Sequence, residues 1–228
     1  MNSRTISIAP EDALRRLREG NRRFRADTRV GTFALEGGAS LQELTSRQDP
    51  FAAVLGCSDS RVPVEIVFGQ GLGQLFVVRV AGNVVAPTQL ASLEFAVTQL
   101  GVRLIVVLGH SGCGAVAHSL ALLARGDSTD PDGHFGSVHE RISRAVLATA
   151  PGERELGLPD RLPDSQEAVV LNVRQSCSDL GHPSGTLAEL LASGTLRVVG
   201  AVYHLDSGEV ESVEDLRDAA PRGARRTS

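Results

Sequence analysis

Lysine and tryptophan are both missing from this sequence of 228 residues, and its 23 basic residues are all arginine. Without a lysine amine, neither Schiff-base chemistry nor a phosphate-binding P-loop is possible. Acidic residues outnumber the basic ones, and the net charge of −4 argues against a nucleic-acid-binding protein, which usually carries a basic surface. Codon bias accounts for the choice of arginine without any functional meaning.

Cysteines and long apolar runs are also scarce. The three cysteines, Cys57, Cys113 and Cys177, form an odd count that indicates free thiols in a reducing compartment. The longest apolar runs, such as 104–108, are too short to span a bilayer, and we see no apolar signal segment. We therefore expect a cytoplasmic protein that folds as one domain.

Apolar, valine-rich runs alternate with helical periods through the middle of the chain. Strands are expected at 51–55, 75–80, 102–108, 195–205 and 210–213, and helices at 10–24, 41–47, 88–100, 114–124, 135–148, 165–180 and 187–191. Polar connections are expected at 31–38 and 126–133, with a frayed tail from 218. Continuous β-branched runs separated by helices are typical of buried parallel strands. The sequence therefore predicts an α/β fold with a central, mostly parallel sheet flanked by helices.

Two loops that follow predicted buried strands carry residues with metal-binding chemistry. Cys57 follows the run 51–55, while His110 and Cys113 follow the run 102–108. Ligands bind at the carboxyl ends of parallel strands, so these side chains can converge there. Singly, each cysteine fits a small buried hydrophobe and His110 fits a core histidine. Together they favour zinc bound by Cys₂His with an open fourth position, since a structural zinc site usually has four protein ligands.

The loop after Cys57 also contains an acid and an arginine. In an extended segment Cys57, Asp59 and Arg61 would share one side, and Arg61 could hold the Asp59 carboxylate bidentately. Without a metal site nearby, this pair would be interpreted as a structural ion pair in a turn. Because it lies beside three candidate zinc ligands, we interpret Asp59 as a conditional fourth ligand whose direction Arg61 controls.

The remaining cysteine and histidines lack ligand spacing. Cys177 is assigned to packing in a helix, and His134, beside the polar loop, is a candidate proton shuttle. The other histidines, His118, His139, His182 and His204, are given no role.

The paired motifs Cys57-x-Asp59-x-Arg61 and His110-x-x-Cys113 resemble those of the β-class carbonic anhydrases. The resemblance extends over roughly residues 10–213 and includes the segments 51–61, 75–83, 92–100, 106–116, 172–174 and 200–210. It implies one domain over 1–228, with an N-terminal helical arm (1–30) that embraces a partner subunit and a frayed tail (214–228). It also implies a homodimer or a dimer of dimers, with each active site near the subunit interface.

The resemblance further implies an activity and the residues that perform it. The implied reaction is the reversible hydration of carbon dioxide to bicarbonate and a proton by zinc-bound hydroxide, with one Zn²⁺ per chain. The resemblance assigns Cys57, His110 and Cys113 to zinc, and Asp59 and Arg61 to a catalytic dyad. The positions that match the substrate site are Gln48, Phe76, Ala81, Phe95 and Gly114. The family often has valine at Ala81 and tyrosine at Phe95.

Some members of that family bind inhibitory bicarbonate at a second site built from tryptophan, arginine and tyrosine. Arg79 and Tyr203 match two of these positions, but Val54 stands where the tryptophan would be. We therefore expect no cooperative inhibition by bicarbonate, and we expect Arg79 to pair with an acid instead.

Two other functions fit the same residues. A hydrolase of CS₂ or COS, which are isoelectronic with CO₂, could use the same metal site, because access to the pocket would decide the substrate. A regulatory or binding protein could hold zinc in a closed site without catalysis. The Asp59–Arg61 pair and Gln48 favour the enzyme, since a passive site would not need them.

Overall fold

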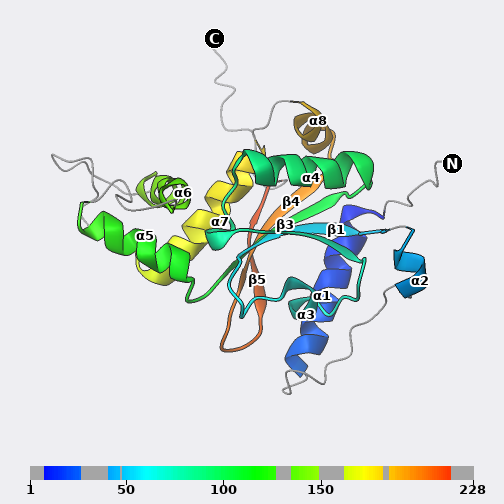
Figure 1. Cartoon of the computed structure of the whole chain (residues 1–228), viewed down its shortest axis with the longest axis horizontal. Helices are drawn as coiled ribbons and strands as arrows, with labels where there is room; N and C mark the ends of the chain where they lie inside the picture. The colour runs from blue at the N-terminus through cyan, green and yellow to red at the C-terminus, as the bar shows by residue number, and fades with distance from the viewer. Residues whose placement is uncertain are drawn as a thin grey trace, which may run out of the picture.

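Five strands form the central sheet, in the order β2-β1-β3-β4-β5 (Figure 1). The structure, a computed structural model, describes residues 8–26, 41–46, 48–126, 135–148, 162–181 and 185–216. Strands β1 (Ala52–Gly56), β2 (Leu75–Arg79), β3 (Leu104–His110) and β4 (Arg197–Tyr203) are parallel to their neighbours, and β5 (Val210–Asp215) is antiparallel to β4. The expected α/β fold with a mostly parallel sheet is confirmed.

Helices cover both faces of the sheet. One face carries α4 (Pro87–Gln99), α5 (Gly114–Ala124), α6 (Gly136–Leu147), α7 (Ser165–Gly181) and α8 (Thr186–Ala192), and the other carries α1 (Pro10–Ala26) and α3 (Val64–Val67) (Figure 1). Leu55 and Ile105 point into the first core, whereas Val54 and Leu104 point into the second. Because successive residues of a strand face opposite sides, β1 and β3 must be apolar throughout.

Helix α1 is held on its own chain by apolar contacts and by a buried amide. Leu14 lies in the second core. Asn21 Nδ2 donates to the carbonyl oxygens of Val67 at 3.1 Å and Gly208 at 2.8 Å, and Asn21 Oδ1 accepts from the Val210 amide at 3.1 Å. This helix therefore packs on the core of its own chain. The arm around a partner subunit, which the resemblance implied, stays a prediction.

Most elements lie within a few residues of their predicted bounds, but two short ones were not predicted. Helix α3 follows Pro63, and a 3₁₀ turn, η1 (Ala81–Asn83), follows β2. Both are too short to show a helical period. Helix α2 (Leu41–Leu44) is shorter than expected. The predicted connection at 31–38, the tail from 218 and nearly all of 126–133 lie outside the described residues. None of the described helices has the length and apolarity needed to cross a bilayer.

Helix α7 packs closely on the sheet where β3 and β4 carry glycine. A Cβ atom built at Gly109 would lie 2.5 Å from Val173 Cγ2, and one built at Gly200 would lie 2.8 Å from Val173 Cγ1. Val173 itself is fully buried. The two glycines therefore allow α7 to approach the sheet directly beside His110.

Replacing Gly109 by alanine is expected to destabilise the fold by about 1–3 kcal/mol, because the added methyl group overlaps Val173. Denaturant unfolding followed by circular dichroism measures this loss. The double variant Gly109→Ala, Val173→Ala is the control, since a smaller residue at 173 makes room for the methyl group. The losses in the free energy of unfolding of the two single variants should therefore sum to more than the loss in the double variant. If the losses are strictly additive, this contact does not limit how closely α7 approaches the sheet.

Candidate active site

The residues predicted to bind a metal converge at the carboxyl ends of β1 and β3. Cys57 directly follows β1, His110 is the last residue of β3, and Cys113 precedes α5. Strands β1 and β3 are parallel neighbours in which Gly56 lies opposite Leu108, so their carboxyl ends meet. All three ligand side chains are buried, with exposed fractions between 0% and 3%.

The candidate ligand atoms form a compact triangle. The sulfur atoms of Cys57 and Cys113 are 3.9 Å apart, and both lie within 4.8 Å of the ring nitrogen offered by His110. Two sulfur atoms that each bind one tetrahedral zinc ion at about 2.3 Å are separated by about 3.8 Å. The separation of the two sulfurs therefore matches zinc coordination.

Hydrogen bonding prepares His110 to bind a metal through Nε2. Nδ1 lies 3.0 Å from the carbonyl oxygen of Ser111, which can only accept, so Nδ1 carries the ring proton of the neutral imidazole. Nε2 is buried and has no hydrogen-bond partner among the described residues. A buried lone pair without a partner is costly, and coordination of a metal removes that cost. Nε2 therefore fits a metal-bound nitrogen.

The two thiols cannot both ionise without a cation between them. A hydrogen bond from Cys113 is the main cause that lowers the pKa of the Cys57 thiol, although burial opposes it. The same hydrogen bond, together with burial, raises the pKa of Cys113 far above its usual range. A metal ion must therefore displace the proton that the pair retains. Two thiolates and one imidazole form a donor set that suits zinc.

Asp59 and Arg61 form a bidentate ion pair beside this ligand set. Arg61 Nε donates to Asp59 Oδ1 at 2.9 Å, and Arg61 Nη2 donates to Asp59 Oδ2 at 2.7 Å. Asp59 Oδ2 also lies 3.8 Å from His110 Nε2. The hydrogen bonds from Arg61 hold the pKa of the Asp59 carboxyl well below its usual range, against an opposing effect of burial. Asp59 is therefore ionised at neutral pH.

The backbone that carries this pair is a turn, and the expectation of an extended segment was wrong. The Val62 amide donates to the Asp59 carbonyl at 3.0 Å, and the Arg61 amide donates to Asp59 Oδ1 at 2.9 Å. An aspartate side chain that accepts from the amide two residues on is a common way to stabilise a turn. Arg61 Nη2 also donates to the Gly112 carbonyl at 3.0 Å, which ties the pair to the loop of Cys113.

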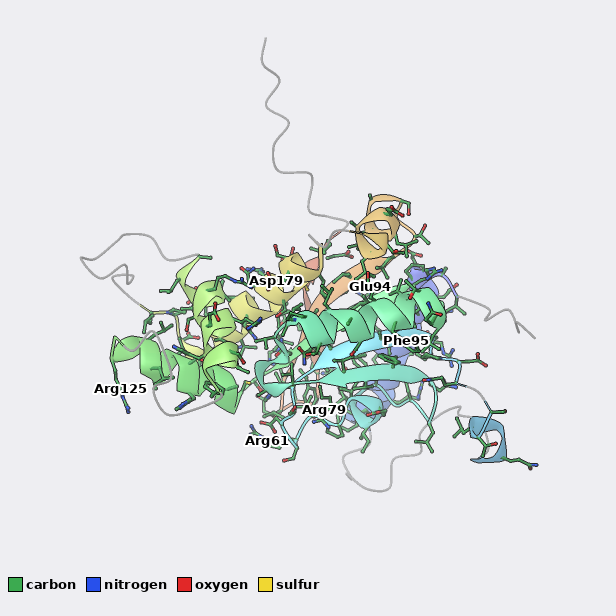
Figure 2. The ribbon with its side chains drawn as sticks, turned by 45° about the horizontal axis from the view of Figure 1, so that its top comes forward. Arg61, Arg79, Glu94, Phe95, Arg125 and Asp179 are labelled. Atoms are coloured by element: carbon green, nitrogen blue, oxygen red, sulfur yellow. The ribbon has the colours of Figure 1, made fainter. Side chains whose placement is uncertain are left out.

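Arg79, at the end of β2, forms hydrogen bonds with the backbone of the same loop. Its Nε donates to the Cys57 carbonyl at 2.9 Å, and its Nη2 donates to the Asp59 carbonyl at 2.7 Å. Figure 2 shows Arg79 and Arg61 on the same side of the molecule. Among the described residues, Arg79 bonds to these two carbonyl oxygens and forms no ion pair with an acid, so the expected pairing is not found there. The guanidinium is instead occupied by carbonyl oxygens of the loop beside it.

Known proteins are similar in sequence to this chain over most of its length. The family described as carbonic anhydrase matches residues 52–210. A carbonic anhydrase of Mycolicibacterium smegmatis is 40% identical over 209 residues, which cover 92% of this chain and 96% of the relative. Carbonic anhydrase 2 of Mycobacterium tuberculosis is 42% identical over 200 residues, which cover 87% of this chain and 90% of the relative.

Two solved structures with a similar fold are β-carbonic anhydrases. A tetrameric β-carbonic anhydrase from Sordaria macrospora is similar with a TM-score of 0.61 and 26% identity, over 75% of this chain and 84% of that one. A β-carbonic anhydrase of Aspergillus fumigatus is similar with a TM-score of 0.60 and 28% identity, over 79% of this chain and 81% of that one. The chain belongs to the β-class carbonic anhydrase family. In this β-class member, Cys57, His110 and Cys113 form the site for one zinc ion per chain.

Two of the residues expected to bind substrate lie beside the zinc site of this β-carbonic anhydrase. Ala81 begins η1, whose Gly82 amide lies 3.4 Å from the Cys57 sulfur. Gly114 directly follows Cys113, and a Cβ atom built on it would meet nothing within 4 Å. Open space therefore adjoins one of the zinc ligands.

The other three expected substrate residues lie elsewhere in the same chain. Gln48 precedes the amino-terminal end of β1, whereas the zinc site lies at the carboxyl end. Phe76 is near the amino-terminal end of the neighbouring strand β2, with its ring 6.2 Å from that of Phe95 on α4. Phe95 is 48% exposed and lies far from Arg61 in Figure 2. A single chain therefore does not bring these three side chains to its own zinc site.

The third cysteine and the other histidines are separate from the zinc site. Cys177 is fully buried in the first core, where burial raises the pKa of its thiol far above the usual range, as expected for a packing residue. His118, His139 and His204 lie outside the ligand set, and His134 and His182 lie outside the described residues.

Two contacts at the site were not predicted from the sequence. These are the bonds of Arg79 to the loop carbonyls and the approach of the Gly82 amide to the Cys57 sulfur. The dipeptide Gly82-Asn83 is a turn signal that could have predicted left-handed residues here. No sequence pattern, however, gives the direction in which an amide or a carbonyl points.

Changing Cys57 or Cys113 to serine is expected to remove most of the bound zinc, because a neutral hydroxyl replaces a thiolate ligand. Elemental analysis of the purified protein measures the zinc content per chain. Cys177→Ser is the matched control and should keep one zinc ion per chain. Full zinc content in Cys57→Ser would contradict the ligand assignment.

Proposed function

We propose that this protein catalyses the reversible hydration of carbon dioxide to bicarbonate and a proton. The Asp59–Arg61 pair carries the proposal, because it brings an ionised carboxylate oxygen to 3.8 Å from His110 Nε2, at the edge of the ligand set. The ligand cluster found among the described residues has three members, one fewer than a structural zinc site usually has. Zinc bound there would act as a Lewis acid that lowers the pKa of a coordinated water to near neutrality.

Asp59 and Arg61 act on the water that attacks carbon dioxide. Arg61 fixes both carboxylate oxygens, so Asp59 Oδ2 is held in one direction and keeps a lone pair available. This oxygen would accept a hydrogen bond from the attacking water and orient the water oxygen toward the carbon of CO₂. A C–O bond forms, one proton of the water leaves to solvent, and bicarbonate departs. Because the pKa of Asp59 is so low, Asp59 orients the water and does not store its proton at neutral pH.

Carbon dioxide would approach along the open side of the site. The space beside Gly114 is unobstructed, and Ala81 contributes a methyl group next to it in the turn after β2. These surfaces suit a small apolar substrate, which needs little more than exclusion from water and a short path to the attacking oxygen.

A second copy of the chain would complete the substrate pocket. Gln48, Phe76 and Phe95 lie away from the zinc site of their own chain, and β2 is an edge strand whose residues Leu75 to Val78 are only half-buried. Pairing of two such edges would bury this surface and bring these side chains toward the partner's zinc site. The tetrameric relative from Sordaria macrospora supports a homodimer or a dimer of dimers.

The proposed activity is tested by stopped-flow measurement of CO₂ hydration at pH 7 and pH 9 on zinc-loaded protein. Arg61→Ala should lower turnover roughly 10- to 100-fold and shift the active range to higher pH, because the freed Asp59 carboxylate would compete with water for the metal. Asp59→Ala should keep its zinc and lose activity. Arg125→Ala, an exposed arginine at the end of α5, is the control and should behave as the unmodified protein. A zinc-loaded protein without hydration activity at either pH would refute the proposal.

Bicarbonate is predicted to inhibit only as a product and without cooperativity. Val54 provides no aromatic surface near Arg79, and the Arg79 guanidinium is occupied by the carbonyls of Cys57 and Asp59. Tyr203 instead packs against Phe24, with ring centroids 6.3 Å apart. Initial rates measured against bicarbonate concentration should give a hyperbolic curve. A sigmoidal loss of activity would show that an inhibitory site exists without tryptophan.

A further inference from the structure

Helix α7 directs two buried polar side chains at the turn that contacts Cys57. Asn172 and Ser176 lie one helical turn apart and are 2% and 3% exposed. Asn172 Nδ2 donates to the Gly82 carbonyl at 2.7 Å, and Ser176 Oγ donates to the Asn83 carbonyl at 3.1 Å. Two successive carbonyl groups of η1 are therefore bonded to the same face of one helix.

The backbone of η1 needs such support. Gly82 has φ 67° and ψ 18°, and Asn83 follows with φ 44°. Asn83 is the one non-glycine residue with positive φ in the part of the chain that the structure describes. Consecutive left-handed residues are unfavourable and persist only where their surroundings fix them.

The same turn directs the Gly82 amide toward the sulfur of the zinc ligand Cys57. The Gly82 amide lies 3.4 Å from the Cys57 sulfur, while the Gly82 carbonyl is held by Asn172. A Cβ atom built at Gly82 would lie 2.9 Å from Ile142 Cδ1 and 3.5 Å from Ala115 Cβ, so α6 and α5 close the turn from other sides. The direction of this amide therefore depends on the contact with α7.

We propose that Asn172 and Ser176 are positioning residues that hold the Gly82 amide on the Cys57 sulfur and thereby tune the metal centre. The inference rests on the zinc site of the proposed function. An amide that donates to a thiolate withdraws charge from the sulfur and fixes its orientation. Loss of the helix contact lets the turn relax, which leaves the sulfur richer in charge and less well placed.

Cobalt substitution tests this directly, because Co²⁺ bound by cysteine has a sulfur-to-metal charge-transfer absorption. Asn172→Leu keeps the size of the side chain and removes its donor. In the Co²⁺-loaded variant, the charge-transfer band should move to longer wavelength, since a more electron-rich sulfur gives up charge more readily. Competition with a chelator should show Zn²⁺ affinity lowered by roughly 10- to 100-fold.

Three further variants separate positioning from stability. Ser176→Ala removes the second donor and should shift the band in the same direction, whereas Ser176→Thr retains the hydroxyl and should restore the position seen in the unmodified protein. Gln175→Leu is the matched control, because Gln175 lies on the same helix and its amide donates to Asp179 at 2.8 Å. This control should leave the band and the zinc affinity unchanged.

The outcomes distinguish this inference from the proposed function. A charge-transfer band in the unmodified protein that stays in place in Asn172→Leu and Ser176→Ala would refute the positioning role alone. If Asn172→Leu does not fold, the comparison of Ser176→Ala with Ser176→Thr decides, and identical bands in these two would refute the role. Absence of any sulfur-to-cobalt band in the unmodified protein would refute the metal site, and with it the proposed function.

Discussion

The parallel pairing of β1 with β3 is the constraint on which the site depends. With Gly56 opposite Leu108, the two strands end together, and Cys57 and His110 reach the same edge of the sheet. Cys113 returns to them through a short turn that contains Gly112 at φ 64°. A slip of one residue in this register would turn one ligand to the opposite face, because side chains alternate along a strand. The apolar residues of both strands therefore determine the relative positions of Cys57 and His110 as well as forming the core.

The ligand set and the dyad differ in their exposure to solvent. The three ligands are almost fully buried, whereas the Asp59 and Arg61 side chains are 17% and 54% exposed. The buried ligands are held in place by the core, and the Asp59–Arg61 pair lies between them and solvent. In the proposed reaction, the ionised carboxylate of Asp59 meets the attacking water there. Because this ion pair is screened by solvent, its main effect is to fix the direction of the carboxylate and not to add stability.

The parts of this site that could be predicted from the sequence are those with local patterns. Continuous apolar runs indicated β1 and β3, and the glycine-flanked Cys57, His110 and Cys113 indicated the ligands. The partners of Arg79 could not be predicted, since a sequence shows charged side chains but not where backbone carbonyls point. The separation of Phe95 from the zinc site of its own chain could not be predicted from a local pattern either, because it depends on where β2 and α4 lie in the fold.

The close packing of α7 on the sheet links the fold to the metal centre. Val173 contacts the sheet where Gly109 and Gly200 have no side chain, and its neighbour Asn172 reaches the Gly82 carbonyl at 2.7 Å. A hydrogen bond of this length tolerates little displacement. A larger residue at either glycine would push α7 away from the sheet and lengthen this hydrogen bond. Gly109 and Gly200 therefore determine how closely α7 approaches the sheet. Through the role proposed for Asn172, they also determine where the Gly82 amide lies relative to the Cys57 sulfur.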